Sequence, residues 1–283
     1  PALVGSLVKL KDRFPLKKII FYDIDNERTS KMEDYIRLVL KTYSNETEVV
    51  FTTDPDVAYE KTDFVFCQMR VGKNEMRSFD EKIPLKHGLV GQETCGPGGF
   101  AYGMRSLGAM VEMVNQVRKH SKDTWILNYT NPAAIVALGL DKVFPDDKRI
   151  LNLCDQPYSL MRSYAKILGV EQKKLRATYF GLNHFGWFTE LKDVDGNDYF
   201  DKLRTYLRDY DFKPYNAEQR SKSWLDTYLR VNKYMNFFDE YIPTTYLQYY
   251  FFAEEIVAES DPNYTRADEA KDSREKEVWD ICS

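Results

Sequence analysis

The sequence of 283 residues has few of the features that mark membrane, nucleic-acid-binding or secreted proteins. No apolar run approaches the about 20 residues of a membrane-spanning helix, so we expect no membrane partner. The formal net charge is −4 and the basic residues are scattered, which gives no reason to expect a nucleic acid partner. No charged leader with an apolar core is present, and the few cysteines lie far apart, which favours a reducing cytoplasm. They are Cys67, Cys95, Cys154 and Cys282.

The residues that are present indicate a globular α/β protein. Hydrophobic residues make up 43% of the chain and aromatic residues 14%, enough for a packed core. Short apolar runs typical of buried strands alternate with helical patterns over the first 170 residues, which predicts a doubly wound, parallel, Rossmann-like sheet. The expected strands are 18–23, 48–52, 63–69, 124–129 and 149–155. The expected helices are 2–14, 101–119, 132–143 and 158–168, together with one that Asn26 caps and that ends at Ser44 and Asn45.

The pattern changes after residue 170. A hairpin is expected from 185–192 and 197–200 around Asp195 and Gly196, and 199–234 reads as mostly helical. We therefore expect a nucleotide-binding Rossmann-like domain over 1–170 and part of a mixed α+β substrate- and metal-binding domain over 171–283. The glycine-rich phosphate loop of a dinucleotide-binding sheet is missing, and the sequence begins with the helix that such a loop would open. The first strand and its loop are therefore expected to be missing, so that the chain is truncated at this end.

Two of the apolar runs end in side chains suited to metal binding or proton transfer. One ends in Cys154 and Asp155, and the other ends in Asn183 and His184. Since ligands of open α/β sheets bind at the carboxyl ends of strands, these ends form a site if they are neighbours. A thiolate and an imidazole would fix a catalytic divalent cation and leave positions open for substrate oxygens. The alternatives are that Cys154 is a small buried hydrophobe and that His184 is a core polar group.

Three further positions each allow two interpretations. Asp23, after the first strand, either accepts hydrogen bonds from an adenosine ribose or forms a turn or helix cap. Asn131, which precedes a proline, either contacts substrate or caps the following helix. The glycine-rich run 91–100 carries Glu93 and follows a segment with Arg77. Its glycines indicate one of two arrangements. Either another group lies close to the backbone, or the run is a solvent-exposed loop that opens a helix.

Four long motifs resemble glycoside hydrolase family four, the NAD- and manganese-dependent glycosidases. They are LNLCDQP, YFGLNHFGW, ILNYTNPAAIV and the run VGKNEMRSFDEKIPLKHGLVGQETCGPGGFAYGMRS. The Cys-Asp pair resembles the 6-phospho-α-glucosidase branch, because other branches place Asn or His after the cysteine. The resemblance implies a cytoplasmic homodimer or homotetramer that cleaves phosphorylated disaccharides such as maltose 6′-phosphate. It also implies that the substrate domain continues beyond Ser283, so both chain ends are expected to be truncated. This family is an exception to the usual scheme of two catalytic carboxylates.

The resemblance also implies a role for each matching residue. Cys154 and His184 would bind Mn2+, Asp155 would be the general acid, Tyr246 the general base, and Glu93 would tune Tyr246. Arg77, Asn131, Asn183 and Arg266 would bind substrate, and Asp23 would hold the NAD ribose. The implied reaction oxidises sugar C3, removes the C2 proton, eliminates the leaving group, adds water and returns the hydride.

Two other functions share the predicted sheet. One is an NAD-dependent 2-hydroxy acid dehydrogenase of the lactate or malate type, which offers no role for a Cys-His metal pair or for Tyr246. The other is a non-catalytic fragment, because a chain without the phosphate loop has lost its pyrophosphate cradle. Dependence on manganese separates the dehydrogenase from the glycosidase.

Overall fold

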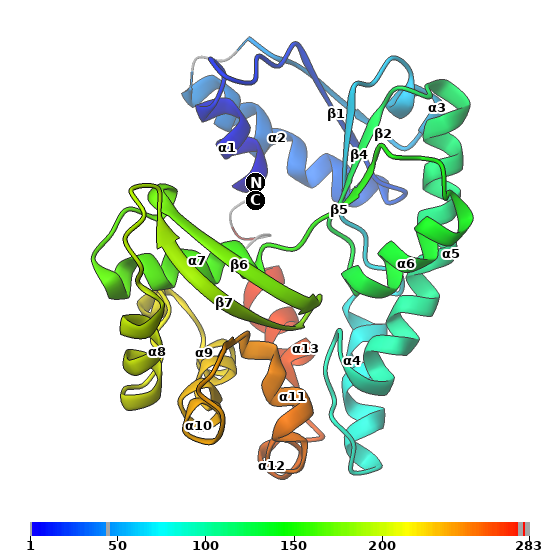
Figure 1. Cartoon of the computed structure of the whole chain (residues 1–283). Helices are drawn as coiled ribbons and strands as arrows, with labels where there is room; N and C mark the ends of the chain where they lie inside the picture. Colours follow the sequence, from blue (N-terminus) through cyan, green and yellow to red (C-terminus); the bar gives the residue numbers. More distant parts are fainter. Residues whose placement is uncertain (1, 44–45, 277–279, 281–283) are drawn as a thin grey trace.

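The chain folds into a parallel α/β part followed by a part built around an antiparallel sheet (Figure 1). The computed structural model describes residues 2–43, 46–276 and 280, and Ser44, Asn45 and Cys282 lie outside them. Parallel strands alternate with helices from the start of the described chain to helix α7 (Gln156–Leu168). The predicted Rossmann-like α/β fold with a second, mixed part is therefore confirmed.

The five strands of the parallel part lie close to the predicted positions. β1 (Lys18–Tyr22) pairs with β2 (Glu48–Thr52), and β3 (Phe64–Cys67), β4 (Trp125–Asn128) and β5 (Ile150–Asn152) pair in that order. All of these pairings are parallel. Within the described residues the strands form two hydrogen-bonded sheets, β1-β2 and β3-β4-β5.

Helices cover the strands on two faces because side chains alternate along each strand. Phe21 of β1 packs with α1 (Ala2–Lys9) and α2 (Asn26–Thr42) around the buried Ile36. Its neighbours Ile20 and Tyr22 join the other cluster, which also contains Ile126 of β4. That cluster is closed by α3 (Pro55–Tyr59), α5 (Gly96–His120) and α6 (Ala133–Val143). Because it contains residues of both β1 and β4, it packs the two sheets against one set of helices.

Two helices of the parallel part, α3 and α4 (Lys73–Lys86), were not predicted. α4 follows Gly72, whose φ of 85° places it in the left-handed region, and contains Pro84. Proline is unfavourable inside a helix, and this obscures the helical pattern in the sequence. The first helix also ends earlier than expected, at Lys9.

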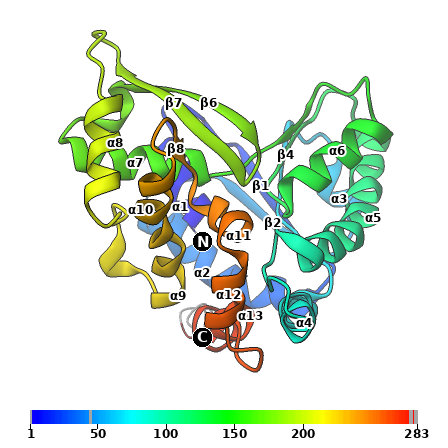
Figure 2. The ribbon, with the colours of Figure 1, turned by 60° about the horizontal axis from the view of Figure 1, so that its bottom comes forward.

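The antiparallel sheet of the second part consists of β6 (Leu175–Leu182), β7 (Phe185–Asp193) and the short β8 (Ile242–Pro243). The expected hairpin around Asp195 and Gly196 forms in part. Its first strand is β7, and after the turn the chain returns antiparallel to β7 at one bridge, between Lys192 and Asp198. Along most of its length β7 pairs with β6 instead. α7, α8 (Phe200–Asp209) and α10 (Arg230–Phe237) contribute to the core that packs against this sheet (Figure 2).

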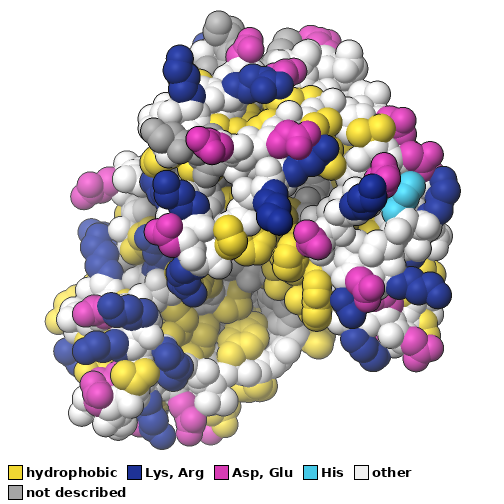
Figure 3. All heavy atoms as spheres, turned by 90° about the horizontal axis from the view of Figure 1, so that it is seen from above, with side chains coloured by type: hydrophobic (Ala, Val, Ile, Leu, Met, Phe, Trp, Pro, Cys, Tyr) yellow, Lys and Arg dark blue, Asp and Glu magenta, His cyan; other side chains and the backbone are white. Residues whose placement is uncertain are grey.

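Short helices complete the second part and join it to the first. They are α9 (Lys222–Leu225), α11 (Gln248–Phe251), α12 (Ala253–Glu259) and α13 (Arg266–Glu269), and a π-helical turn follows at Ala270–Glu275. Asp268 of α13 accepts hydrogen bonds from Ser78 and Lys82 of α4. From above, apolar side chains gather around a hollow near the middle of the molecule (Figure 3). Among the described helices, none has both the length and the apolar character needed to cross a membrane.

Candidate active site

Cys154 and His184 come from different parts of the chain and meet in space. Cys154 follows the end of β5, and His184 is the second residue of the tight turn between β6 and β7. Its φ of 61° is left-handed, a conformation that histidine adopts more readily than most residues. Gly181, at φ 114°, precedes the turn, and a Cβ there would lie 2.4 Å from the carbonyl oxygen of Phe185. The turn places His184 Nε2 3.7 Å from Cys154 Sγ.

The protonation states of this pair suit a cation. Burial lowers the pKa of His184 to about 4, although Glu93 acts in the opposite direction, so the imidazole is neutral at pH 7. Burial raises the pKa of Cys154, while hydrogen bonds from the Gln156 backbone and the Asn183 side chain lower it in part. A bound cation would convert the thiol to the thiolate that ligates metals.

The donor set fits a catalytic metal better than a structural one. The described residues contain no group of three or more His, Cys, Asp or Glu side chains that could hold an ion. Structural zinc sites need four protein ligands, whereas a catalytic ion keeps open positions for water or substrate. Cys154 and His184 would supply one sulfur and one nitrogen ligand, and the remaining positions would be open.

Tyr246 lies directly against the histidine. Its ring stacks on the His184 ring with the centroids 3.9 Å apart and the planes at 27°. Burial raises the pKa of Tyr246 well above its usual value, and the nearby Tyr249 and Glu93 raise it further. A phenolate at this position therefore needs a neighbouring positive charge.

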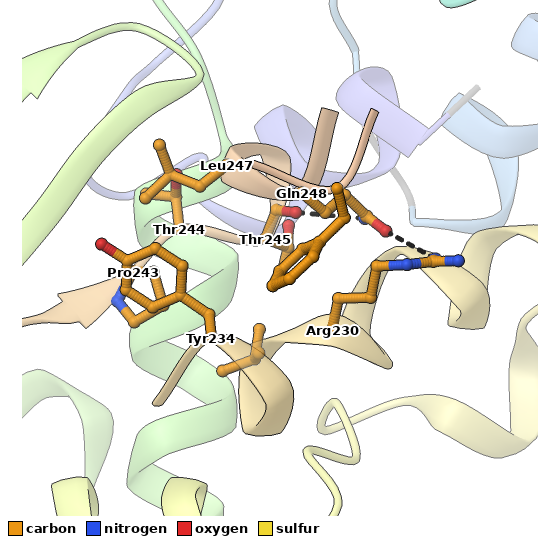
Figure 4. A pocket seen from close by; sticks show the side chains of 9 residues that line it. Arg230, Tyr234, Pro243, Thr244, Thr245, Leu247 and Gln248 are labelled. Atoms are coloured by element: carbon orange, nitrogen blue, oxygen red, sulfur yellow. Dashed lines mark hydrogen bonds between the residues drawn. The ribbon is translucent and has the colours of Figure 1, made fainter. Parts of the chain in front are cut away.

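The segment that carries Tyr246 is held by buried polar contacts. It is the 3-10 turn Thr245–Leu247, and Gln248 follows it. The Gln248 amide donates to the carbonyl oxygens of Thr227 and Thr245 and accepts from Arg230 (Figure 4). The cavity behind this segment measures about 10 Å³, room for a single water and not for a sugar.

A buried ion-pair network lies beside Tyr246. Glu93 pairs with Arg70 at 2.6 Å and with Arg77 at 3.3 Å, and Arg77 also pairs with Glu81 at 2.7 Å. Burial would raise the pKa of Glu93, but Arg77 and Arg70 outweigh it and hold the pKa below its usual value. Glu93 is therefore charged. Arg70 was not among the predicted site residues, although its place shortly after the end of β3 is a signal that could have found it.

The glycine-rich run is packed against protein and is not a solvent-exposed loop. A Cβ at Gly91 or Gly98 would lie 2.0 Å from a backbone carbonyl oxygen of α4, that of Glu81 or Asp80 respectively. A Cβ at Gly99 would lie 2.3 Å from the backbone of Thr94. Helix α5 begins at Gly96 within this run. The glycines therefore allow the chain that carries Glu93 to approach α4 closely.

Asp155 and Asn131 stand at the starts of helices without capping them. Asp155 precedes α7, is exposed, and makes no side-chain cap hydrogen bond. The residue at the N-cap position of α6 is Pro132, so the capping interpretation of Asn131 is wrong. Both polar side chains are therefore left available for other interactions.

The two remaining predicted residues have partners of their own. The Asp23 carboxylate accepts from the Asp25 backbone N–H at 3.0 Å and lies 3.6 Å from Arg28. Arg266 donates to Ser221 and Glu269, and the next backbone N–H, of Ala267, donates to Glu81.

Hydrogen bonds, ion pairs and ring stacking thus divide the predicted residues. Cys154, Asn183, His184 and Tyr246 form one cluster. Glu93 and Arg77 form the adjoining ion-pair network, and Glu81 connects it to the backbone N–H of Ala267, the residue after Arg266. No hydrogen bond or ion pair within the described residues joins Asp23 or Asn131 to these groups.

In this chain, polar side chains that could act on a ligand follow the carboxyl ends of parallel strands. This arrangement is typical of Rossmann-fold proteins. Comparison with family models identifies the family. Residues 1–170 match the family 4 glycosyl hydrolase model, and residues 179–283 match the model of the C-terminal domain of the same family. The chain therefore belongs to family 4 of the glycosyl hydrolases.

The names of two similar proteins both describe glucosidases that act on phosphorylated glucosides. The chain is 46% identical to phospho-alpha-glucosidase PagL of Clostridium acetobutylicum, with 99% of this chain and 63% of the relative covered. It is 42% identical to maltose-6′-phosphate glucosidase of Bacillus subtilis, with 100% and 63% covered. The crystal structure of a 6-phospho-alpha-glucosidase from gut microorganisms, in complex with NAD and Mn2+, superimposes with a TM-score of 0.97 at 45% identity, covering 100% of this chain and 66% of that one. The chain thus spans slightly less than two thirds of these relatives.

Proposed function

We propose that the protein hydrolyses 6-phospho-α-glucosides, such as maltose 6′-phosphate, with the help of NAD and a divalent cation such as Mn2+. The observation that carries this proposal is the distance of 3.7 Å between Cys154 Sγ and His184 Nε2, with the Tyr246 ring stacked on the imidazole at 3.9 Å. The names of the relatives, and the NAD and Mn2+ bound to the similar crystal structure, support it.

The residues that would hold the two cofactors follow from their chemistry. Cys154 and His184 would ligate the cation, since a thiol and a neutral imidazole are available there. Asp23, at the end of β1, would accept hydrogen bonds from the NAD ribose. When bound, NAD would accept a hydride from sugar C3 and the cation would polarise the resulting ketone, which acidifies the proton on C2.

Two side chains would then move protons. The Tyr246 phenolate would remove the C2 proton, and the negative charge of Glu93, which raises the tyrosine pKa, makes that phenolate a stronger base. The Asp155 carboxyl group would protonate the departing glycosidic oxygen, and the exposed carboxyl is free of a cap bond that would occupy it. The C1–O bond would break as the C2 proton leaves. Water would then add its oxygen to C1 while a proton returns to C2, and return of the hydride to C3 would restore the sugar.

Four residues would bind the substrate. Asn131 and Asn183 offer amides for sugar hydroxyls, and Arg77 and Arg266 offer guanidinium groups suited to a 6-phosphate. Both guanidinium groups already have carboxylate partners, which are Glu81 and Glu93 for Arg77 and Glu269 for Arg266.

The domain division, location and assembly are also proposals. We propose an NAD-binding domain over 1–170 and part of a substrate- and metal-binding domain over 171–283. Cys67, Cys95 and Cys154 are free thiols, as expected of a protein kept in a reducing cytoplasm. We further propose a homodimer or homotetramer, which light scattering of the purified protein would test.

The assay that tests the proposal is cleavage of a chromogenic 6-phospho-α-glucoside with NAD or Mn2+ omitted in turn, after treatment with a chelator. Cleavage is expected only when both are supplied, and no net NADH should accumulate because the hydride returns to C3. Cleavage in the absence of NAD, or in the absence of Mn2+, would contradict the proposal. Net NADH formation from a 2-hydroxy acid would favour the dehydrogenase alternative, and inactivity in the complete mixture would favour the non-catalytic one.

A further inference from the structure

A chain of hydrogen bonds runs from the glycine-rich segment to the side of His184 that faces away from Cys154. It begins at Gln92, whose Oε1 accepts from the backbone N–H of Thr94 at 2.6 Å and from that of Cys95 at 2.9 Å. A backbone N–H can only donate, so the side-chain atom that faces both must be the amide oxygen. The orientation of the Gln92 amide is thereby fixed.

The Thr94 hydroxyl is the second link. Its Oγ1 lies 2.9 Å from Gln92 Oε1 and 2.9 Å from His184 Nδ1. The amide oxygen cannot donate, so the single hydroxyl hydrogen points to Gln92 and an oxygen lone pair faces the imidazole. The Cys95 sulfur, at 3.8 Å, makes the longest of the contacts of this hydroxyl and carries a hydrogen of its own to donate. His184 Nδ1 must therefore carry the hydrogen of this bond.

We propose that Gln92 and Thr94 are positioning residues that hold His184 in its Nδ1–H tautomer. The neutral imidazole then keeps an unprotonated Nε2, whose lone pair faces Cys154 Sγ at 3.7 Å and accepts from the thiol in the absence of a cation. The stack with Tyr246 limits rotation of the same ring. The inference rests on the proposed function for the role of His184 as a ligand, but the tautomer is a property of the chain alone.

The glycines explain how Gln92 and Thr94 are kept in place. Gly91 lies against the backbone of Glu81, and Gly99 lies against the backbone of Thr94 itself. Any larger residue at either position would push the 92–95 segment away from its present position. The glycine-rich run therefore carries two groups that act on the site. One is the charged Glu93 beside Tyr246, and the other is the hydrogen-bonded pair Gln92 and Thr94, which sets the tautomer of His184.

The direct test is ¹⁵N NMR of the imidazoles in the metal-free protein at neutral pH. The signal of His184 is assigned by its loss in His184→Gln, since the chain has only three histidines. We expect a protonated Nδ1 and an unprotonated Nε2. A protonated Nε2 with an unprotonated Nδ1 would overturn the inference, and this readout depends on neither metal binding nor activity.

The second test is Mn2+ binding, followed by the electron paramagnetic resonance signal of the free ion. Thr94→Val keeps the shape but removes the hydroxyl, and we expect its Kd to rise about 10- to 100-fold. Thr94→Ser keeps the hydroxyl and should bind within about 3-fold of the unaltered protein, well inside that range. Wild-type affinity in Thr94→Val, or equal losses in both variants, would contradict the role of the hydroxyl. Absence of Mn2+ binding by the unaltered protein would contradict the proposed function, while the tautomer measurement would still decide this inference.

Discussion

At the scale of single residues, Asp155 differs from the other charged side chains of the site because the fold makes no use of its carboxylate. It is exposed at the start of α7 without a cap hydrogen bond, whereas Glu93, Arg77 and Arg266 all have ionic partners. A group without a structural role can be replaced with little effect on folding. Its replacement therefore tests chemistry more cleanly than a change in the ion-pair network.

We expect Asp155→Asn to slow cleavage of substrates with poor leaving groups by about 100- to 10,000-fold, because these need a proton from a general acid. Substrates with activated leaving groups should be slowed less than about 10-fold, since they depart without that proton. Steady-state kinetics on a matched pair of phosphoglucosides measures both. Asp141→Asn, a change at an exposed acid of α6, is the control and should leave both rates unchanged. Equal slowing of the two substrate types would argue against an acid role.

Among single residues, the sequence could predict those that follow the carboxyl end of a strand, where open α/β sheets bind their ligands. That rule selected Cys154 and His184 because each follows an apolar run, and the structure brings them within 3.7 Å. Tyr246 follows no such run, so only the family resemblance singled it out. The Thr94 contact with His184 spans 90 positions of the sequence, and no local pattern encodes a pairing of that kind.

At the scale of secondary-structure elements, the start of α5 is the feature on which the site depends most. Gly98 lies in the first turn of this helix, where it packs against the backbone of α4. Gly108 lies later in the same helix, and a Cβ there would meet nothing within 4 Å. The two glycines therefore provide a matched pair, one required for close packing and one free of it.

We expect Gly98→Ala to lower the free energy of unfolding by at least about 2 kcal/mol, because the new methyl group would overlap the carbonyl oxygen of Asp80. Gly108→Ala should raise it by about 0.5–1 kcal/mol, since alanine favours an exposed helix position. Urea unfolding of both variants makes the comparison. Equal effects of the two substitutions would show that α5 does not need close contact with α4.

A second link between elements joins the end of α5 to the loop before β5. Arg118 binds Asp147 through Nε at 2.5 Å and Nη2 at 3.1 Å, and it also donates to the carbonyl oxygen of Thr124. Burial would raise the pKa of Asp147, but the hydrogen bonds from Arg118 and the Arg149 backbone outweigh it and lower the pKa. The carboxylate therefore stabilises the folded state above the pKa of an unfolded aspartate, and this contribution is lost as the pH falls through the lower, folded pKa.

Asp147→Asn should accordingly cost about 1–3 kcal/mol of unfolding free energy at pH 7, the usual range for a hydrogen bond to a charged group. The difference from the unaltered protein should shrink as the pH falls below about 4, the pKa of an unfolded aspartate, and vanish below the lower folded pKa, where the carboxyl group is protonated in both states. Asp146→Asn, at the exposed neighbouring acid, is the control. Denaturant unfolding at several pH values provides the measurement, and a difference that does not change with pH would contradict the ionic origin.

Helices and strands were predicted well where a local sequence pattern determines them. They were predicted poorly where they depend on pairing between distant segments. β2 agrees with the predicted strand 48–52 at both ends, because a compact apolar run lies between polar residues. The expected hairpin of 185–192 with 197–200 forms only at one bridge, and β7 pairs along most of its length with β6 through the turn at Asn183 and His184. A histidine at φ 61° is an uncommon turn residue, so the sequence did not indicate that the chain reverses there.

At the scale of the whole molecule, the site exists because two parts of the chain meet. The first part supplies Cys154, Glu93 and Thr94, and the second supplies His184 and Tyr246. α13 returns to α4, where the Ala267 backbone N–H donates to Glu81 and Asp268 pairs with Lys82. The α/β class and the change of pattern after residue 170 were predictable from composition and periodicity. The packing of one part on the other was not, because it depends on contacts between distant residues.

The central claim is that the paired Cys154 and His184, with Tyr246 beside them, support removal of the sugar C2 proton. The most direct measurement is cleavage of a 6-phospho-α-glucoside in D2O with NAD and Mn2+ present, followed by NMR of the released glucose 6-phosphate. We predict deuterium at C2, because the proton taken by Tyr246 exchanges with solvent before a deuteron is returned. Full retention of hydrogen at C2 during complete cleavage would contradict the account.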